Sequence, residues 1–142
     1  DAACTQFENE NIEVIGIAKD GIKGWTTSKL PSDILEELSI NELINQLKDH
    51  KDLQVLDVRE PIEWEMGHIP GAKLISLGDV SHKSNEIAKD KPLAVICEAG
   101  VRSCTAASLL LKQGFTKVYN VPEGTSGYRN SSEVMEFTEL ED

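Results

Sequence analysis

The stretch that most constrains the fold of this 142-residue chain is PLAVICEAGVRSCTAASLLLKQG, residues 92–114. It begins with an apolar run that predicts a buried strand over residues 92–97. Small residues and leucines then predict a helix over residues 103–113, which ends at Gly114 because glycine readily adopts the left-handed conformation that closes many helices. A buried strand joined to a helix by a short loop is typical of chains that build a parallel sheet.

The elements predicted elsewhere alternate in the same way. Ser39 and Glu42 form a capping-box pattern at the start of an amphipathic helix that runs to about Asp49, and a weaker helix is predicted over residues 84–89. Short apolar runs predict further strands at residues 53–58, 72–77 and 117–121. This alternation predicts the α/β class, with a central parallel sheet and helices on both faces. Sites in such sheets lie at the carboxyl ends of strands, which is where Cys97 stands.

Charge and cysteine content exclude several classes of protein. The net charge of −11 argues against nucleic acid as a partner, because such binding needs clustered Lys and Arg. No apolar run reaches the 18 or more residues of a membrane span, so we expect a cytoplasmic protein without membrane contact or export signal. Three cysteines are too few for a disulfide framework and lack the spacing of a zinc site, so no metal or cofactor is predicted.

The loop after Cys97 suggests why a cysteine ends the strand. If residues 98–102 connect the strand to the helix, their N–H groups turn inward around a sulfur that lies at the helix N-terminus. Unpaired N–H donors and the helix dipole favour an anion there, and such surroundings lower a thiol pKa to about 3.5–7.5. Cys97 is therefore a candidate nucleophile at neutral pH. Gly100 allows a tight turn, and Arg102 adds a permanent cation at the rim.

Loop length separates two kinds of cysteine chemistry. Four residues, EAGV, stand between Cys97 and Arg102. Thiolate phosphatases with a related strand–loop–helix design place five residues there, enough to cradle a tetrahedral phosphate. The smaller ring suits a single sulfur atom, so a cysteine-dependent phosphatase or arsenate reductase is a disfavoured alternative.

Two motifs resemble the rhodanese family of sulfurtransferases. Residues 97–103, CEAGVRS, are similar to the family's active loop, which reads Cys, four residues, Arg, and then Ser or Thr. Residues 56–77, LDVREPIEWEMGHIPGAKLISL, are similar to its Asp-Val-Arg, Glu-aromatic and Gly-His-Ile-Pro-Gly-Ala signature. Residues 121–130 depart from the family's closing Gly-Gly-x-x-x-Trp motif, because Glu123 replaces the first Gly and Tyr128 replaces Trp.

The resemblance implies a rhodanese-like three-layer sandwich and a ping-pong sulfur transfer. Cys97 would take the outer sulfur of thiosulfate or of a low-molecular-weight persulfide, hold it as a persulfide, and pass it to a thiol or cyanide acceptor. The residues after it would form the substrate cradle: Glu98, Ala99, Gly100, Val101, Arg102 and Ser103. Arg102 would orient anionic donors. Asp57 and Arg59 are possible supporting residues, for which an internal ion pair is favoured over contact with substrate.

Other interpretations stay open. An alternative function is a persulfide-carrying interaction module that serves a fused or neighbouring sulfur-metabolism domain. Glu98 and the acidity of the chain predict that thiosulfate is a poorer donor than a less charged persulfide. Cys104 is expected in the core, with a resolving thiol as the alternative. His68 is expected to belong to a structural turn rather than to act as a base.

Three segments are predicted along the chain: a lead-in over residues 1–31, a rhodanese-like domain over residues 32–131, and a frayed acidic tail over residues 132–142. The lead-in contains DGIKGW followed by LP, which resembles the family's closing motif. One hypothesis is therefore that the chain is the C-terminal piece of a tandem rhodanese or of a fusion with a metallo-hydrolase, and the equal alternative is a plain N-terminal extension. Under the first hypothesis, Trp25 packs outside the domain.

Overall fold

The computed structural model describes residues 20–49 and 52–138 and divides the chain into two units, residues 1–34 and 35–142. Most of the predicted lead-in and the last residues of the acidic tail lie outside the described residues. In the first unit, the described residues form one helix, α2 (Gly21–Thr27), which contains Trp25. The Trp25 indole N–H donates to the carbonyl of Pro31 at 2.9 Å, within this same unit.

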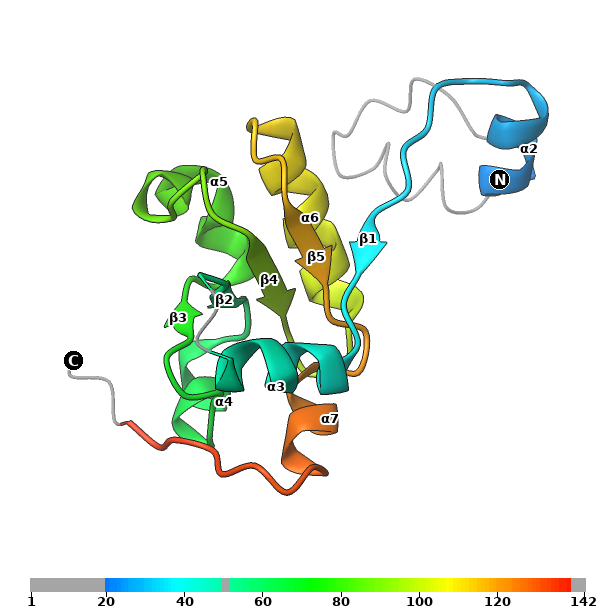
Figure 1. Cartoon of the computed structure of the whole chain (residues 1–142). Helices are drawn as coiled ribbons and strands as arrows, with labels where there is room; N and C mark the ends of the chain where they lie inside the picture. The colour runs from blue at the N-terminus through cyan, green and yellow to red at the C-terminus, as the bar shows by residue number, and fades with distance from the viewer. Residues whose placement is uncertain (1–19, 50–51, 139–142) are drawn as a thin grey trace, which may run out of the picture. The chain divides into compact units, whose positions relative to one another are not determined.

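The second unit is built on a five-stranded, all-parallel sheet with strand order β1-β5-β4-β2-β3 (Figure 1). The strands are β1 (Glu36–Glu37), β2 (Gln54–Asp57), β3 (Lys73–Leu74), β4 (Leu93–Ile96) and β5 (Val118–Asn120). The α-helices are α3 (Ile40–Lys48), α4 (Pro61–Glu65), α5 (Val80–Lys83), α6 (Val101–Lys112) and α7 (Gly124–Arg129). Short 3-10 turns η1 (Leu77–Asp79) and η2 (Ser84–Glu86) flank α5. The predicted α/β class with a parallel sheet is confirmed.

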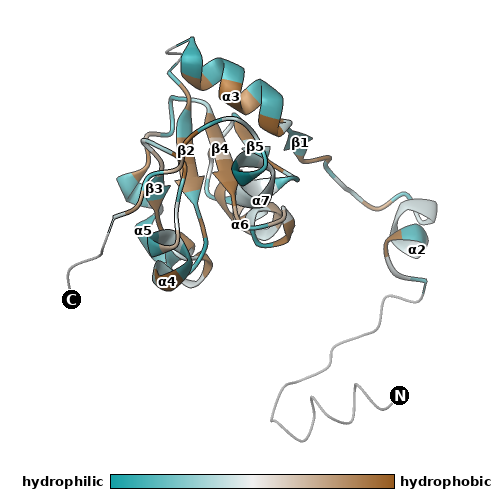
Figure 2. Cartoon of the chain, turned by 90° about the horizontal axis from the view of Figure 1, so that it is seen from below, coloured by the Kyte–Doolittle hydropathy of each residue, from teal (hydrophilic) through white to brown (hydrophobic). Residues whose placement is uncertain are grey.

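Helices cover both faces of the sheet. Figure 2 shows α3 on one side of the strands and α5 and α6 on the other. The alternation of side chains along a strand divides β4 between the two apolar clusters: Val95 packs with α6, whereas Ile96 packs beneath α3. Burial of each large aliphatic side chain contributes about 1.5–3 kcal/mol to stability. Because β4 contributes side chains to both clusters, it is stabilised from both faces at the centre of the sheet. Cys97 continues the cluster on the α6 side.

Helix boundaries follow local signals closely. The predicted capping box starts α3: the Ser39 hydroxyl accepts from the Glu42 N–H at 3.3 Å, and Glu42 accepts from the Ser39 N–H at 2.9 Å. Helix α6 begins at Val101, two residues earlier than predicted, and Gly114 follows its end with a φ of 93°. Tyr128 is buried, so it fills the corner where the closing motif departs from the family pattern.

Several elements differ from the sequence prediction. The helix predicted over residues 84–89 lies earlier, as α5 and η2, and β3 has only two residues. The described part of the acidic tail is not frayed, because Glu136 and His68 exchange two backbone hydrogen bonds of 2.9 Å. On either side of Glu136, Met135 packs against the core and the Phe137 ring lies over Gly67. These tertiary contacts hold the tail on the domain.

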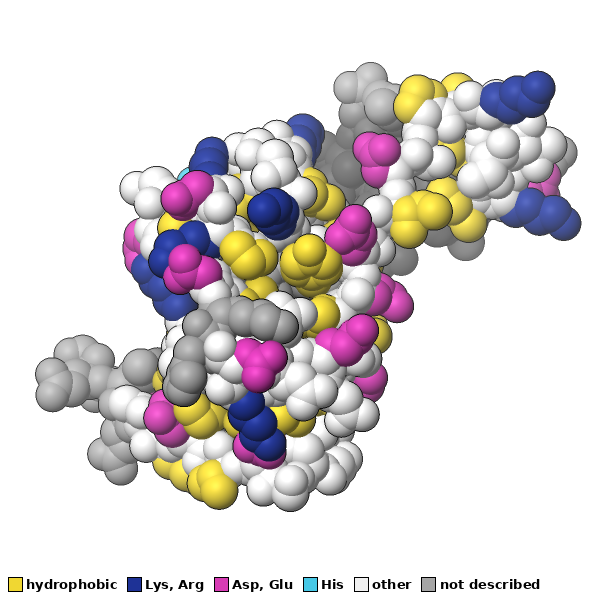
Figure 3. All heavy atoms as spheres, viewed as in Figure 1, with side chains coloured by type: hydrophobic (Ala, Val, Ile, Leu, Met, Phe, Trp, Pro, Cys, Tyr) yellow, Lys and Arg dark blue, Asp and Glu magenta, His cyan; other side chains and the backbone are white. Residues whose placement is uncertain are grey.

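The surface is mixed in character. On the face shown in Figure 3, acidic side chains are scattered among basic and apolar ones rather than gathered over one element. Among the described residues, no helix is both long enough and apolar enough to cross a bilayer.

Candidate active site

Cys97 follows β4 at the carboxyl end of the sheet and is 2% exposed. The chain turns sharply at Gly100, which has a φ of 81°, and α6 begins at the next residue. A Cβ at Gly100 would lie 2.6 Å from the carbonyl oxygen of Pro122, so only glycine fits this turn. The turn brings the N-terminus of α6 to the sulfur.

Helix α7 holds the same loop from its other side. The Thr125 N–H donates to the carbonyl of Cys97 at 2.8 Å, and the Ser126 N–H donates to the carbonyl of Glu98 at 3.1 Å. Gly124, with a φ of 61°, allows this close approach because a Cβ there would collide with both carbonyls. Helix α7 thereby binds the carbonyl groups of the loop, and the N–H groups of the loop remain available to the Cys97 sulfur.

The surroundings of Cys97 favour its thiolate. Burial raises the pKa of the thiol, but hydrogen bonds from Ser103 and from the backbone N–H groups of Ala99 and Arg102 more than offset burial, so the pKa lies below its ordinary value. The Ser103 hydroxyl oxygen lies 3.4 Å from Cys97 Sγ. These contacts produce a buried, activated thiol, which is the chemistry of a cysteine nucleophile.

Arg102 lies at the rim but is already paired. Its guanidinium makes two hydrogen bonds to Glu63 on α4, of 2.6 and 2.7 Å. Chiefly because of these bonds, the pKa of Glu63 is lowered to about 2. Glu63 also accepts from the Glu60 N–H at 3.0 Å, in the capping box of α4, so its carboxylate is held in place. Glu63 was not singled out from the sequence, although the Glu-aromatic part of the signature contains it.

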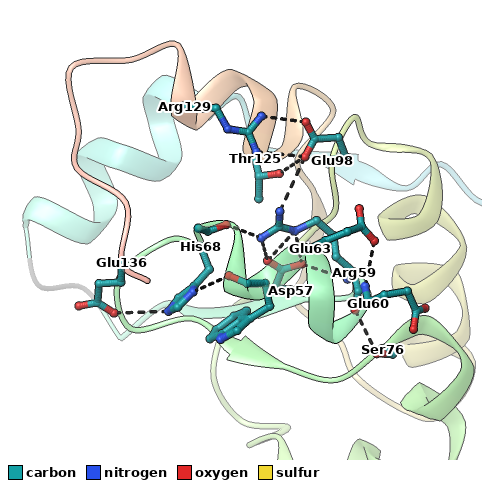
Figure 4. A network of polar contacts seen from close by, with 12 residues as sticks. Asp57, Arg59, Glu60, Glu63, His68, Ser76, Glu98, Thr125, Arg129 and Glu136 are labelled. Atoms are coloured by element: carbon teal, nitrogen blue, oxygen red, sulfur yellow. Dashed lines mark hydrogen bonds and ion pairs between the residues drawn. The ribbon is translucent and has the colours of Figure 1, made fainter. Parts of the chain in front are cut away.

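Glu98 turns toward α7, where its carboxylate joins the polar network of Figure 4. It accepts from the Thr125 hydroxyl at 2.7 Å and from Arg129 at 2.9 Å, and Arg59 lies 3.8 Å away. The hydrogen bond from Arg129 is the main reason that the pKa of Glu98 is lowered. The Val101 side chain, by contrast, is 78% exposed. The predicted cradle residues therefore contact the Cys97 sulfur mainly through their backbone N–H groups and less through their side chains.

Asp57 and Arg59 form a buried internal ion pair (Figure 4). Arg59 donates to the carboxylate of Asp57 at 2.8 to 3.1 Å, and it also donates to the carbonyl of Gly67 at 2.8 Å. Ser76 donates to the Arg59 carbonyl at 3.0 Å. The pair thus ties the connection after β2 to the turn at Gly67, and it lies beside Glu98 at the edge of the loop.

Two further sequence interpretations have different outcomes. His68 lies in a structural turn: its ring stacks on Trp64 at a centroid distance of 3.6 Å, and its Nδ1 lies 3.1 Å from the Trp64 carbonyl oxygen. The prediction that Cys104 belongs to the core is wrong, because this residue is exposed. Since α6 begins at Val101, Cys104 lies in the first turn, and Ser103 occupies the buried position.

The fold and the site together define an α/β protein with an activated cysteine at a helix N-terminus. Residues 39–131 match the family described as Rhodanese-like domain, and the chain belongs to this family. It is 33% identical to thiosulfate sulfurtransferase GlpE of Shewanella oneidensis, over 68% of this chain and 95% of that protein. A rhodanese-like domain protein from Staphylococcus aureus has a similar structure, with a TM-score of 0.67, 31% identity, and coverage of 73% of this chain and 99% of that one.

Some curated relatives are longer than the matched region. The chain is 36% identical to the Bacillus subtilis protein YrkF over 111 residues, which make up 78% of this chain but 60% of that protein.

Proposed function

We propose that this protein is a sulfurtransferase that passes a sulfane sulfur through a persulfide on Cys97. The observation that carries the proposal is the buried Cys97 thiol, whose pKa is lowered by the hydroxyl and N–H groups around it. Relatives named thiosulfate sulfurtransferase support the same type of reaction. The donor is thiosulfate or a low-molecular-weight persulfide, and the acceptor is a thiol or cyanide.

The reaction needs no external oxidant or reductant. The Cys97 thiolate attacks the outer sulfur of the donor, and the new S–S bond forms as the donor's own bond to that sulfur breaks. Sulfite or a thiolate leaves with the electron pair. The acceptor then attacks the terminal sulfur, so that thiocyanate or a new persulfide departs and the Cys97 thiolate is regenerated. Backbone N–H groups of the loop stabilise the charge on sulfur in both steps.

The rim charges favour a weakly charged donor. In the described part of the chain, Arg59, Arg102 and Arg129 each have a carboxylate partner, so a dianion meets guanidinium groups that are already neutralised. A persulfide carries at most one negative charge at its reacting end, so it meets less of this competition. We therefore propose such a persulfide, in preference to thiosulfate, as the better donor.

A persulfide-carrying interaction module is the second candidate. Exposed apolar side chains lie near the Arg102–Glu63 pair in the chain: Ile62 on α4, Met66 directly after α4, and Val101 at the start of α6. Such residues suit contact with another protein surface better than contact with a small anion. In that case the acceptor is a thiol on a fused or neighbouring domain.

Three substrates assayed side by side test the proposal: thiosulfate, glutathione persulfide and an aryl phosphate. A sulfurtransferase is expected to turn over glutathione persulfide faster than thiosulfate and to leave the aryl phosphate intact. An interaction module is expected to load Cys97 with sulfur but to release it slowly to small thiols. Hydrolysis of the aryl phosphate without sulfur transfer would contradict both candidates.

Arg102→Ala is expected to raise KM for thiosulfate by about tenfold, which is equivalent to about 1.4 kcal/mol, because it leaves the Glu63 carboxylate unpaired beside the donor. KM for an uncharged donor is expected to change much less. The matched control is Glu63→Gln, which frees the guanidinium and is expected to lower KM for thiosulfate. Equal changes for charged and uncharged donors would show that Arg102 acts only through the shape of the loop.

A further inference from the structure

Asn120, the last residue of β5, lies next to the reactive loop although it is far from it in sequence. Its side chain is almost completely buried, and its Oδ1 accepts a hydrogen bond from the Ser103 hydroxyl at 2.7 Å. The same hydroxyl oxygen lies 3.4 Å from Cys97 Sγ. Cys97, Ser103 and Asn120 therefore form a continuous chain of polar contacts inside the domain, called the Cys97–Ser103–Asn120 chain below.

The Cys97–Ser103–Asn120 chain has a direction, because a serine hydroxyl carries a single proton. When that proton is donated to Asn120 Oδ1, the Ser103 oxygen can only accept from Cys97. This arrangement fits the thiol, whose S–H supplies a donor. A thiolate in the same place would instead face a lone pair of the Ser103 oxygen, which is unfavourable for an anion.

The thiolate requires the opposite direction. The Ser103 hydroxyl then turns its proton toward the sulfur, and its oxygen needs a donor from the other side. The amide of Asn120 can supply this donor, since rotation about its last bond exchanges Oδ1 for the Nδ2–H₂ group. Ser103 is fully buried and Asn120 is 4% exposed, so bulk water has little access to this position.

We propose that Asn120 is a positioning residue for the nucleophile, which sets the direction of the Ser103 hydrogen bond by presenting either its oxygen or its nitrogen. Its oxygen matches the thiol, and its nitrogen matches the thiolate. An amide serves both states, whereas a carboxylate can only accept from Ser103 when it is ionised. The proposal rests on the proposed role of Cys97, but its test reads the thiol itself rather than sulfur transfer.

Substitution at Asn120 leaves the strand connections in place. The carbonyl of Asn120 accepts from the Leu38 N–H at 2.9 Å, and its backbone pairs with Val95 of β4, so neither contact uses the side chain. The charged groups around the loop stay the same in every variant used below: Asp57, Arg59, Glu63, Glu98, Arg102 and Arg129.

The test measures the pH dependence of Cys97 alkylation by iodoacetamide in the full chain. Trypsin cleaves after Arg102, so the Cys97 peptide is separated from the peptide that carries the exposed Cys104. Asn120→Asp is expected to shift the midpoint of Cys97 alkylation upward by about one pH unit or more, because the carboxylate holds the Ser103 proton away from the sulfur. Asn120→Leu is expected to give a smaller shift, because Ser103 can then turn freely.

A second background separates the direction of the hydrogen bond from the added charge. In Ser103→Ala, the direct repulsion between the carboxylate introduced by Asn120→Asp and the thiolate remains, but the hydroxyl is gone. The proposal predicts that the shift caused by Asn120→Asp falls to less than half in this background. The same shift in both backgrounds, or a shift below about 0.3 units with Ser103 present, would overturn it. Failure of sulfur transfer in a protein that shows the predicted shifts would count against the proposed function and not against the role of Asn120.

Discussion

Cys97→Ser is expected to reduce sulfur transfer to background, a loss of roughly 10³-fold or more, because a serine hydroxyl forms no stable persulfide. The substituted side chain is similar in size and stays in contact with the Ser103 hydroxyl, so the free energy of unfolding is expected to change by about 1 kcal/mol at most. Turnover with glutathione persulfide and a thermal melt of the same sample are the two measurements.

Cys104→Ser is the matched control for this variant. Cys104 is a free thiol in the first turn of α6, and it is exposed, whereas Cys97 precedes this helix and is buried. The control is expected to retain full activity. An active Cys97→Ser protein, or an inactive Cys104→Ser protein, would show that the chemistry had been assigned to the wrong thiol.

Gly124→Ala is expected to destabilise the domain by about 2–4 kcal/mol and to lower its Tm by roughly 10–20 °C. Two costs add: the backbone has a φ of 61°, which strains any side chain with a Cβ, and that Cβ would collide with the carbonyls of Cys97 and Glu98. Both colliding groups belong to the reactive loop, so activity is expected to fall even at temperatures where the variant stays folded.

Gly78→Ala provides the comparison. Gly78 lies in the short turn η1, has no positive φ, and has open space where a Cβ would be placed. Its Tm is expected to stay within a few degrees of that of the original protein. Equal stability of the two variants would show that α7 does not hold the loop tightly.

The reactive loop could be predicted from the sequence because its signals are local. An apolar strand, a cysteine, a glycine and a helix follow one another within about 20 residues, and each step depends on neighbours in the chain. Ser39 and Glu42 are predictable for the same reason, since a capping box joins residues three positions apart. The α/β class follows from the order of these local elements.

The partners of the loop could not be predicted, because they come from distant parts of the chain. Helix α7 has only six residues, two of them glycine, and no apolar period, yet its N–H groups hold the loop carbonyls. The two glutamates of β1 have little strand propensity and pair only because β5 offers a free edge. Glu63 and Asn120 reach Arg102 and Ser103 through tertiary contacts that have no fixed spacing in sequence.

Two predictions failed for different physical reasons. Cys104 is not in the core, because the face of a helical residue depends on where the helix begins, and α6 begins at Val101. The acidic tail was judged from its composition, whereas its backbone pairs with His68 and its apolar side chains cover Gly67. Composition predicts disorder only where such contacts are lacking.

The persulfide on Cys97 is tested most directly by the mass of the tryptic peptide that ends at Arg102. This mass is measured after the protein is treated with a persulfide donor and its free thiols are blocked. We expect an increase of about 32 Da, one sulfur atom, on Cys97, and loss of this increment when a thiol acceptor is added. The same increment on the Cys104 peptide, with Cys97 unmodified, would contradict this expectation.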